Sequence, residues 1–130
     1  MAGKLVHLEL PAKDGARARN FYSSLFGWKF KDSGMPDMDY FMTDGQEGPV
    51  AAVYTSPDQK GPIVYFGVED IDAAIRQVRQ LGGTAEEKGA AEGQGWFVAC
   101  MDTEGNPFSV WQDDEAAPSM APGQAVNTTV

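Results

Sequence analysis

The sequence has few of the residues that metal, redox and membrane proteins usually need. Cys100 is the only cysteine, which excludes an internal disulfide and a thiolate metal cluster. His7 is the only histidine, so a metal site built on several imidazoles is also excluded. No apolar run approaches the ~20 residues of a membrane span, and the N-terminus has no signal-peptide core. We therefore expect a cytoplasmic protein.

Positive charge is also scarce. The 130 residues include 10 Lys and Arg against 19 Asp and Glu, which gives a net charge of −9. Nucleic-acid binding needs basic patches that neutralise phosphate, and anionic membranes attract basic surfaces. We expect neither partner, while an acidic pocket for a cationic ligand stays open. A hydrophobic content of 42% fits one compact domain.

The first half predicts a strand, a helix and three further strands. Alternation over Leu5–Leu10 places His7 and Glu9 on one face and Leu8 and Leu10 on the other. Asp14 is a good N-cap, apolar residues follow at helical spacing, and Gly27 is a typical helix end. The predicted strands are Trp28–Phe30, Tyr40–Thr43 and Val50–Thr55. The apolar helix face is predicted to comprise Ala18, Phe21, Tyr22 and Leu25.

The second half repeats this order. Ile63–Val68 is an apolar strand, Asp70 is the next N-cap, and Gly82-Gly83 ends the helix. Gly95–Met101 and Pro107–Gln112 read as strands joined by a tight turn. The residues predicted to form the core face of this helix are Ile71, Ala74, Ile75, Val78 and Leu81.

An offset of 56 positions relates the two halves. It pairs Asp14 with Asp70, Gly27 with Gly83, and Tyr40-Phe41-Met42 with Trp96-Phe97-Val98. We predict an α+β fold of two βαβββ modules, 4–56 and 61–112, in one domain spanning 1–112. The modules would form a cupped, mostly antiparallel eight-stranded sheet with helices outside. Residues 113–130 are polar and Ala/Pro-rich, and are expected to form a flexible tail or arm.

These features resemble the vicinal oxygen chelate superfamily, which includes glyoxalase I, extradiol dioxygenases and bleomycin-resistance proteins. The resemblance is closest to small bacterial glyoxalase-like single-domain proteins, and homodimerisation is expected by the same analogy. The residues that carry it are His-Leu-Glu-Leu-Pro at 7–11, Arg-Asn-Phe-Tyr-Ser-Ser-Leu-Phe-Gly-Trp-Lys-Phe at 19–30, Tyr-Phe-Gly-Val-Glu-Asp-Ile-Asp at 65–72, Leu-Gly-Gly at 81–83 and Asp-Thr-Glu-Gly-Asn-Pro-Phe-Ser-Val-Trp-Gln at 102–112.

The resemblance also locates a metal site. Its four ligand positions map to His7, about Val53, Ile63 and Ser109. Valine and isoleucine cannot bind a metal, and a neutral serine hydroxyl is a poor ligand. Glu9 could add one oxygen beside His7, which still makes a weak site. We therefore predict neither metal nor other cofactor.

The candidate site residues each have a functional and a structural interpretation. His7 and Glu9 are tentative catalytic residues, an acid–base pair in a cavity, or else an inert former ligand and a rim carboxylate. The proposed ligand-binding residues, otherwise core or dimer contacts, are Tyr65, Trp96, Ser109 and Trp111. Cys100 lacks an activating neighbour and is interpreted as a packed residue.

Three functions are compatible with the sequence. The leading hypothesis is a metal-independent small-molecule-binding protein of the glyoxalase/bleomycin-resistance type, sequestering a cationic or aromatic ligand. An alternative is a glyoxalase-like lyase or isomerase that uses His7 and Glu9, with or without a metal. The third is a stress-related or regulatory protein with a vestigial pocket.

Overall fold

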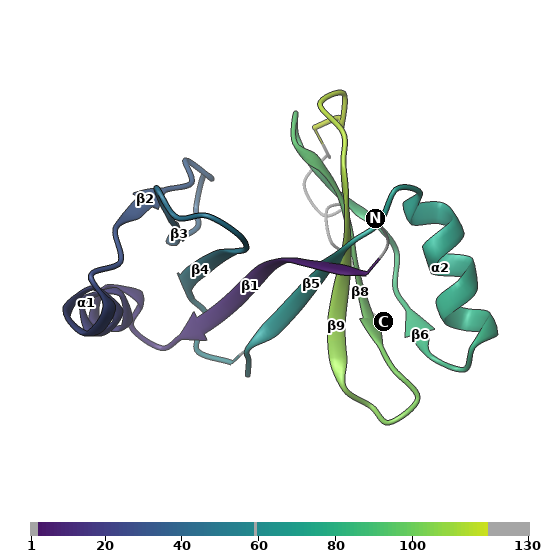
Figure 1. The fold of residues 1–130 in the computed structure, drawn as a ribbon, viewed down its shortest axis with the longest axis horizontal. Helices are drawn as coiled ribbons and strands as arrows, with labels where there is room; N and C mark the ends of the chain where they lie inside the picture. The colour runs from purple at the N-terminus through teal and green to yellow at the C-terminus, as the bar shows by residue number, and fades with distance from the viewer. Residues whose placement is uncertain (1–2, 59, 120–130) are drawn as a thin grey trace. The chain divides into compact units, whose positions relative to one another are not determined.

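The computed structural model describes residues 3–58 and 60–119. These residues form two units, one within Val6–Ile63 and the other combining residues 3–5 with residues 64–119. Figure 1 shows that each unit combines one helix with a sheet. The predicted α+β class, with two strand–helix–strand modules, is therefore confirmed. No helix in the described part of the chain is long and apolar enough to cross a membrane.

The sheet of the first unit has the strand order β2-β3-β4-β1. β1 (Lys4–Ala12) precedes helix α1 (Gly15–Phe26), and three strands follow: β2 (Phe30–Asp32), β3 (Tyr40–Thr43) and β4 (Val50–Thr55). The pair β1–β4 is parallel, whereas β2–β3 and β3–β4 are antiparallel.

The second unit has the equivalent order β5-β9-β8-β6, with a further short strand β7 paired to β8. Its elements are β5 (Ile63–Gly67), α2 (Ile71–Gln80), β6 (Thr84–Ala85), β7 (Gly89–Ala91), β8 (Gly95–Met101) and β9 (Pro107–Asp113). The pair β5–β9 is parallel and the others are antiparallel. The sequence did not predict β6 and β7, because two or three residues of a strand carry too little alternation to be recognised.

Both helices begin as predicted. The Asp14 carboxylate accepts a hydrogen bond from the Arg17 N–H, and Asp70 does the same for Ala73. Gly27 ends α1 with a φ of 74°, a left-handed conformation that glycine adopts without steric cost. These caps satisfy backbone groups that would otherwise have no partner at the helix ends.

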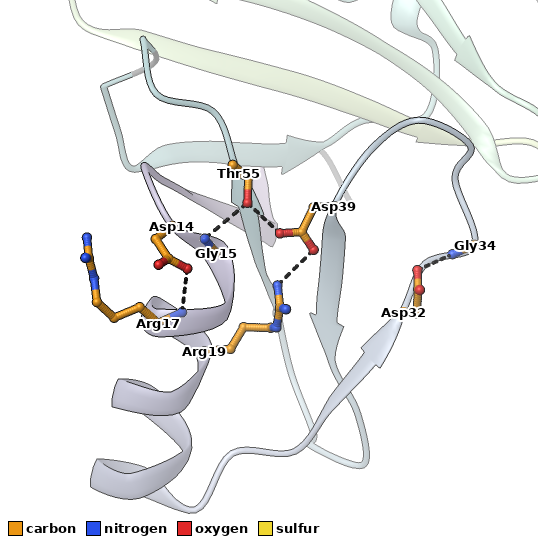
Figure 2. A network of polar contacts seen from close by, with 8 residues as sticks. All are labelled: Asp14, Gly15, Arg17, Arg19, Asp32, Gly34, Asp39 and Thr55. Carbon is orange, nitrogen blue, oxygen red and sulfur yellow. Dashed lines mark hydrogen bonds and ion pairs between the residues drawn. The ribbon is translucent and has the colours of Figure 1, made fainter.

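A second acceptor meets the start of each helix from the last strand of its unit. The Thr55 hydroxyl accepts from the Gly15 N–H at 3.1 Å, and the Gln112 side-chain oxygen accepts from the Ile71 N–H at 2.8 Å. In the first unit Thr55 also donates to Asp39, which binds Arg19 of α1 (Figure 2). The two units therefore fasten helix to sheet at the same place, as an internal repeat would.

The helices differ in how they pack. Ile71 is 1% exposed and lies in a core cluster with Val98, Cys100 and Val110, against which Ala74, Ile75 and Val78 pack. The predicted core face of α2 is therefore confirmed apart from Leu81, which is 70% exposed.

The predicted apolar face of α1 is wrong for two of its four residues. Phe21 and Leu25 are 59% and 58% exposed, whereas Ala18, Arg19 and Tyr22 are partly buried. The Arg19 guanidinium lies 3.7 Å above the centre of the Phe41 ring, so an ion-paired arginine occupies the place expected for an apolar side chain.

The homodimer expected from the resemblance stays a prediction.

The offset between the units grows along the chain. Glu9 pairs with Ala52 in β1–β4, whereas Tyr65 pairs with Ser109 in β5–β9. Position 9 thus corresponds to position 65, an offset of 56, but position 52 corresponds to position 109, an offset of 57. The second unit contains one extra residue before its last two strands. Because strand side chains alternate, a shift of one residue exchanges the two faces.

The C-terminal segment follows β9 without a break. Asp113 is the last residue of β9, and the chain then packs on the turn between β7 and β8. The Gly93 N–H donates to the Ala117 carbonyl, and the Asp114 N–H donates to the Gln94 carbonyl. Ala117 is 4% exposed. This part of the predicted flexible tail is therefore packed, and residues 120–130 lie outside the described residues.

Candidate functional site

The sheet of the first unit has a helix-facing side and a helix-free side. Phe41 and Thr55 contact α1. Val53 precedes Thr55 by two residues on β4, so its side chain lies on the same helix-facing side. His7 and Glu9 lie on the opposite side. The predicted ligand position Val53 is therefore wrong by one residue, and its neighbours Ala52 and Tyr54 share the face of His7.

A short chain of hydrogen bonds joins His7 to Glu9 through a residue that the sequence did not single out. The Tyr40 hydroxyl donates to Glu9 Oε2 at 2.7 Å and lies 2.8 Å from His7 Nε2. Since the one phenol proton is directed to Glu9, the phenol oxygen accepts a hydrogen bond from His7, which fixes the Nε2–H tautomer of the imidazole. Tyr40 is 6% exposed, whereas His7 and Glu9 are partly exposed. A buried hydroxyl thus links two accessible ionisable groups.

Tyr54 completes this cluster. Its ring lies 5.3 Å from the ring of Tyr40, and it is 8% exposed. Burial is the main cause that raises the pKa of Tyr54 above its usual value. The negative charge of Glu9 and a hydrogen bond between Tyr54 and Glu9 raise it further. We call His7, Glu9, Tyr40 and Tyr54 the tyrosine–glutamate cluster.

The electrostatics of the cluster keep the imidazole neutral. Burial lowers the pKa of His7 from 6.5 to about 4, since desolvation penalises the charged form. At neutral pH the histidine is therefore an uncharged hydrogen-bonding group. It becomes protonated only when the pH falls to about 4.

The residues present do not fit the metal that the resemblance implies. A catalytic divalent site takes about three His or carboxylate ligands plus an open position. The helix-free face of the first unit offers His7 and Glu9 beside Ala52, and the corresponding residues of the second unit are Tyr65 and Ser109. Across residues 3–58 and 60–119 no group of three or more His, Cys, Asp or Glu could hold a metal ion.

The second unit brings three of the predicted ligand-binding residues to one face. Tyr65 lies directly opposite Ser109, and Trp111 follows two residues later on the same side of β9. Phe97 of β8 lies opposite Trp111, so it joins this side, which faces away from α2. Ser109 is 4% exposed, and the three aromatic residues are partly exposed. Phe97 was not among the predicted residues, because a constant offset of 56 aligns Trp96 with Tyr40.

The structure separates Trp96 from the other predicted ligand-binding residues. It packs against the core cluster under α2, its indole N–H donates to Asp114 at 2.9 Å, and Lys88 lies 4.5 Å from its ring centre. Cys100 belongs to the same core and is 5% exposed, which confirms that it is packed. The pKa of its thiol is raised to about 11, and burial is the main cause.

Comparison with known proteins identifies the family. A model described as a glyoxalase-like domain matches residues 6–111. The chain belongs to this family. The resemblance to the vicinal oxygen chelate superfamily is therefore confirmed, over nearly the range that the sequence motifs covered.

The relatives that match this chain differ in name. A glyoxylase-like domain-containing protein of Didymella fabae is 34% identical over 83% of this chain and 92% of its own length. The anthracycline biosynthesis protein DauV of Streptomyces sp. (strain C5) is 30% identical over 93% of this chain, which spans about half, 46%, of the relative. Methylmalonyl-CoA epimerase from Mycobacterium tuberculosis has a TM-score of 0.67 and 16% identity over 85% of this chain and 88% of its own. That likeness concerns the fold alone.

Proposed function

We propose that this chain is a metal-independent small-molecule-binding protein of the glyoxalase-like family. The observation that carries the proposal is the helix-free side of the second unit. On this side the neighbouring strands β5, β9 and β8 carry Tyr65, Trp111 and Phe97. These aromatic side chains are partly exposed, and none belongs to a core cluster of the described residues. Aromatic walls with a few polar groups are typical of small-molecule sites, and Ser109 supplies a hydroxyl between them.

A panel of aromatic, cationic, anionic and thioester compounds tests this proposal by equilibrium dialysis of the full chain. At least one compound is expected to bind, and Phe97→Ala should weaken that binding by roughly tenfold, since stacking contacts contribute about 0.5–1.5 kcal/mol beyond the area they bury. Phe21→Ala, which removes an exposed aromatic ring from α1, is the matched control. Absence of binding across the panel would overturn the proposal.

A second candidate function is proton transfer by an enzyme, and the tyrosine–glutamate cluster favours it. Glu9 would take a proton from a carbon next to a carbonyl group, leaving an enolate, and would return a proton to that carbon. Two hydrogen bonds, from His7 to Tyr40 and from Tyr40 to Glu9, end on this carboxylate, so they would orient Glu9 for the proton transfer. The name of the structural relative, methylmalonyl-CoA epimerase, suggests thioesters with an acidic α-proton as the first substrates to try.

Deuterium exchange tests this second candidate directly. In D2O an active enzyme incorporates deuterium at the α-carbon of the thioester, which proton NMR detects without any assumption about the product. Glu9→Gln should abolish the exchange, whereas Glu104→Gln, in the exposed turn before β9, should leave it unchanged. Exchange that persists in Glu9→Gln would exclude this role for the cluster.

A further inference from the structure

Trp111 is held in one orientation by two neighbours on the helix-free side of the second unit. Its indole N–H donates to Asp113 Oδ1 at 2.7 Å. Its six-membered ring lies against Gly95, where a Cβ atom would stand 2.5 Å from Cζ2 and 2.9 Å from Cε2 of the indole. Only glycine permits such a close approach. The ring is therefore fixed before any ligand arrives, which reduces the conformational entropy that binding would otherwise cost.

The strand register explains how this arrangement forms. Gly95 pairs with Asp113, and Phe97 pairs with Trp111, across the antiparallel strands β8 and β9. The indole extends diagonally from its own position towards Gly95 and the carboxylate opposite it. Phe97 stands directly across from Trp111, so two aromatic side chains and one carboxylate lie on neighbouring positions of one face.

The charge of this face selects among ligands. Asp113 is exposed, and its carboxylate lies at the edge of the indole rather than above it. An aromatic face attracts cations through its quadrupole, and an adjacent carboxylate adds to that attraction. A planar cation could stack on the ring while its charge lies near Asp113. An anionic ring would be repelled by the same carboxylate, and by a chain whose net charge is −9.

We propose that Trp111, positioned by Gly95 and Asp113, is a stacking site for a planar aromatic cation. This inference rests on the proposed function and names the ligand class of the same face. Trp111 provides the contact surface, Asp113 the complementary charge, and Gly95 the space in which the indole lies.

Two probes of nearly identical shape separate stacking from charge. 10-Methylacridinium is a planar cation, and acridine at about pH 8 is its neutral counterpart. Binding of each to the full chain is measured by fluorescence polarisation of the probe, and quenching of protein fluorescence assigns the site by comparison with Trp111→Leu. We expect the cation to bind at least about fivefold more tightly than acridine, and Trp111→Leu to weaken it by roughly tenfold or more.

Asp113→Asn isolates the contribution of the charge. The amide oxygen of asparagine can still accept the indole N–H, so the ring keeps its orientation while the negative charge is lost. Binding of 10-methylacridinium should fall by about threefold to fivefold, and binding of acridine should not change. Glu104→Gln removes one negative charge at the other end of the same hairpin and is the matched control, expected to have no effect.

The outcomes distinguish this inference from the function on which it rests. If acridine and the cation bind Trp111 equally, or if Asp113→Asn behaves like Glu104→Gln, the preference for a cation is wrong while small-molecule binding stands. If neither probe binds, or if binding survives Trp111→Leu, the stacking site itself is refuted. The wider ligand panel then decides the fate of the proposed function independently.

Discussion

The ionisation of His7 gives the sharpest test of the tyrosine–glutamate cluster. Burial lowers the pKa of His7 to about 4 in the folded protein, whereas the unfolded chain should titrate near the ordinary value of 6.5. Below pH 6.5 the unfolded state therefore binds more protons, and the folded state loses stability as the pH falls. The loss is complete once the pH has passed below about 4.

The size of this effect follows from the two pKa values. One pKa unit corresponds to about 1.4 kcal/mol, so the full difference is worth about 3 kcal/mol. Between pH 7 and pH 5 the free energy of unfolding should fall by about 2 kcal/mol from this group alone. That window lies above the ordinary pKa of carboxylates, which limits their contribution.

Two measurements check this prediction. Because His7 is the only histidine, its ring carbon signals can be followed by NMR during a pH titration without assignment. Urea unfolding at pH 5, 6 and 7 gives the stability, and the His7→Gln variant, whose amide can still donate to Tyr40, serves as the reference. An apparent pKa between 6 and 7 in the folded protein would refute the argument, as would an unchanged pH dependence in His7→Gln.

Three further predictions concern the supporting contacts. Tyr40→Phe removes the hydrogen bonds of Tyr40 with His7 and Glu9 and should lower the free energy of unfolding by about 2 kcal/mol in urea; a loss below about 0.5 kcal/mol would contradict the geometry. Thr55→Val and Gln112→Leu each remove an acceptor from a helix start, and each should cost about 1 kcal/mol by the same measurement; an unchanged stability would show that these acceptors do not stabilise the helix starts. Cys100 is buried and its pKa is raised to about 11, so a thiol reagent at about pH 8 should label it only after unfolding; rapid labelling of the native protein would show that the packing is wrong.

Local sequence signals predicted much of the fold. Asp14 and Asp70 cap the helices where their spacing to the first apolar residues indicated, and the strands at Tyr40–Thr43, Val50–Thr55 and Gly95–Met101 were located without error. Such signals depend on residues that lie within one turn or one strand of each other. For the same reason, the alternation in β1 correctly placed His7 and Glu9 on one face.

The candidate site was only half predictable, because strand pairing joins residues that are distant in the sequence. Tyr54 lies two residues after Ala52, the partner of Glu9, and Tyr40 lies opposite Tyr54. Both tyrosines therefore share the face of Glu9, but this follows only from the strand register. The assumption of a constant offset instead selected Val53 and paired Trp96 with Tyr40. One extra residue in the second unit was enough to exchange the faces, and Phe97 was overlooked as a result.

The sequence by itself determined the family, the two α+β modules and the position of His7, the only histidine. These depend on residue identity, on short-range periodicity and on counting. The tertiary structure alone decided that Tyr40 links His7 to Glu9 and that Gly95 and Asp113 hold Trp111. Those contacts depend on the hydrogen-bonded register between strands, and a period of two cannot distinguish one register from the next until the strands are paired.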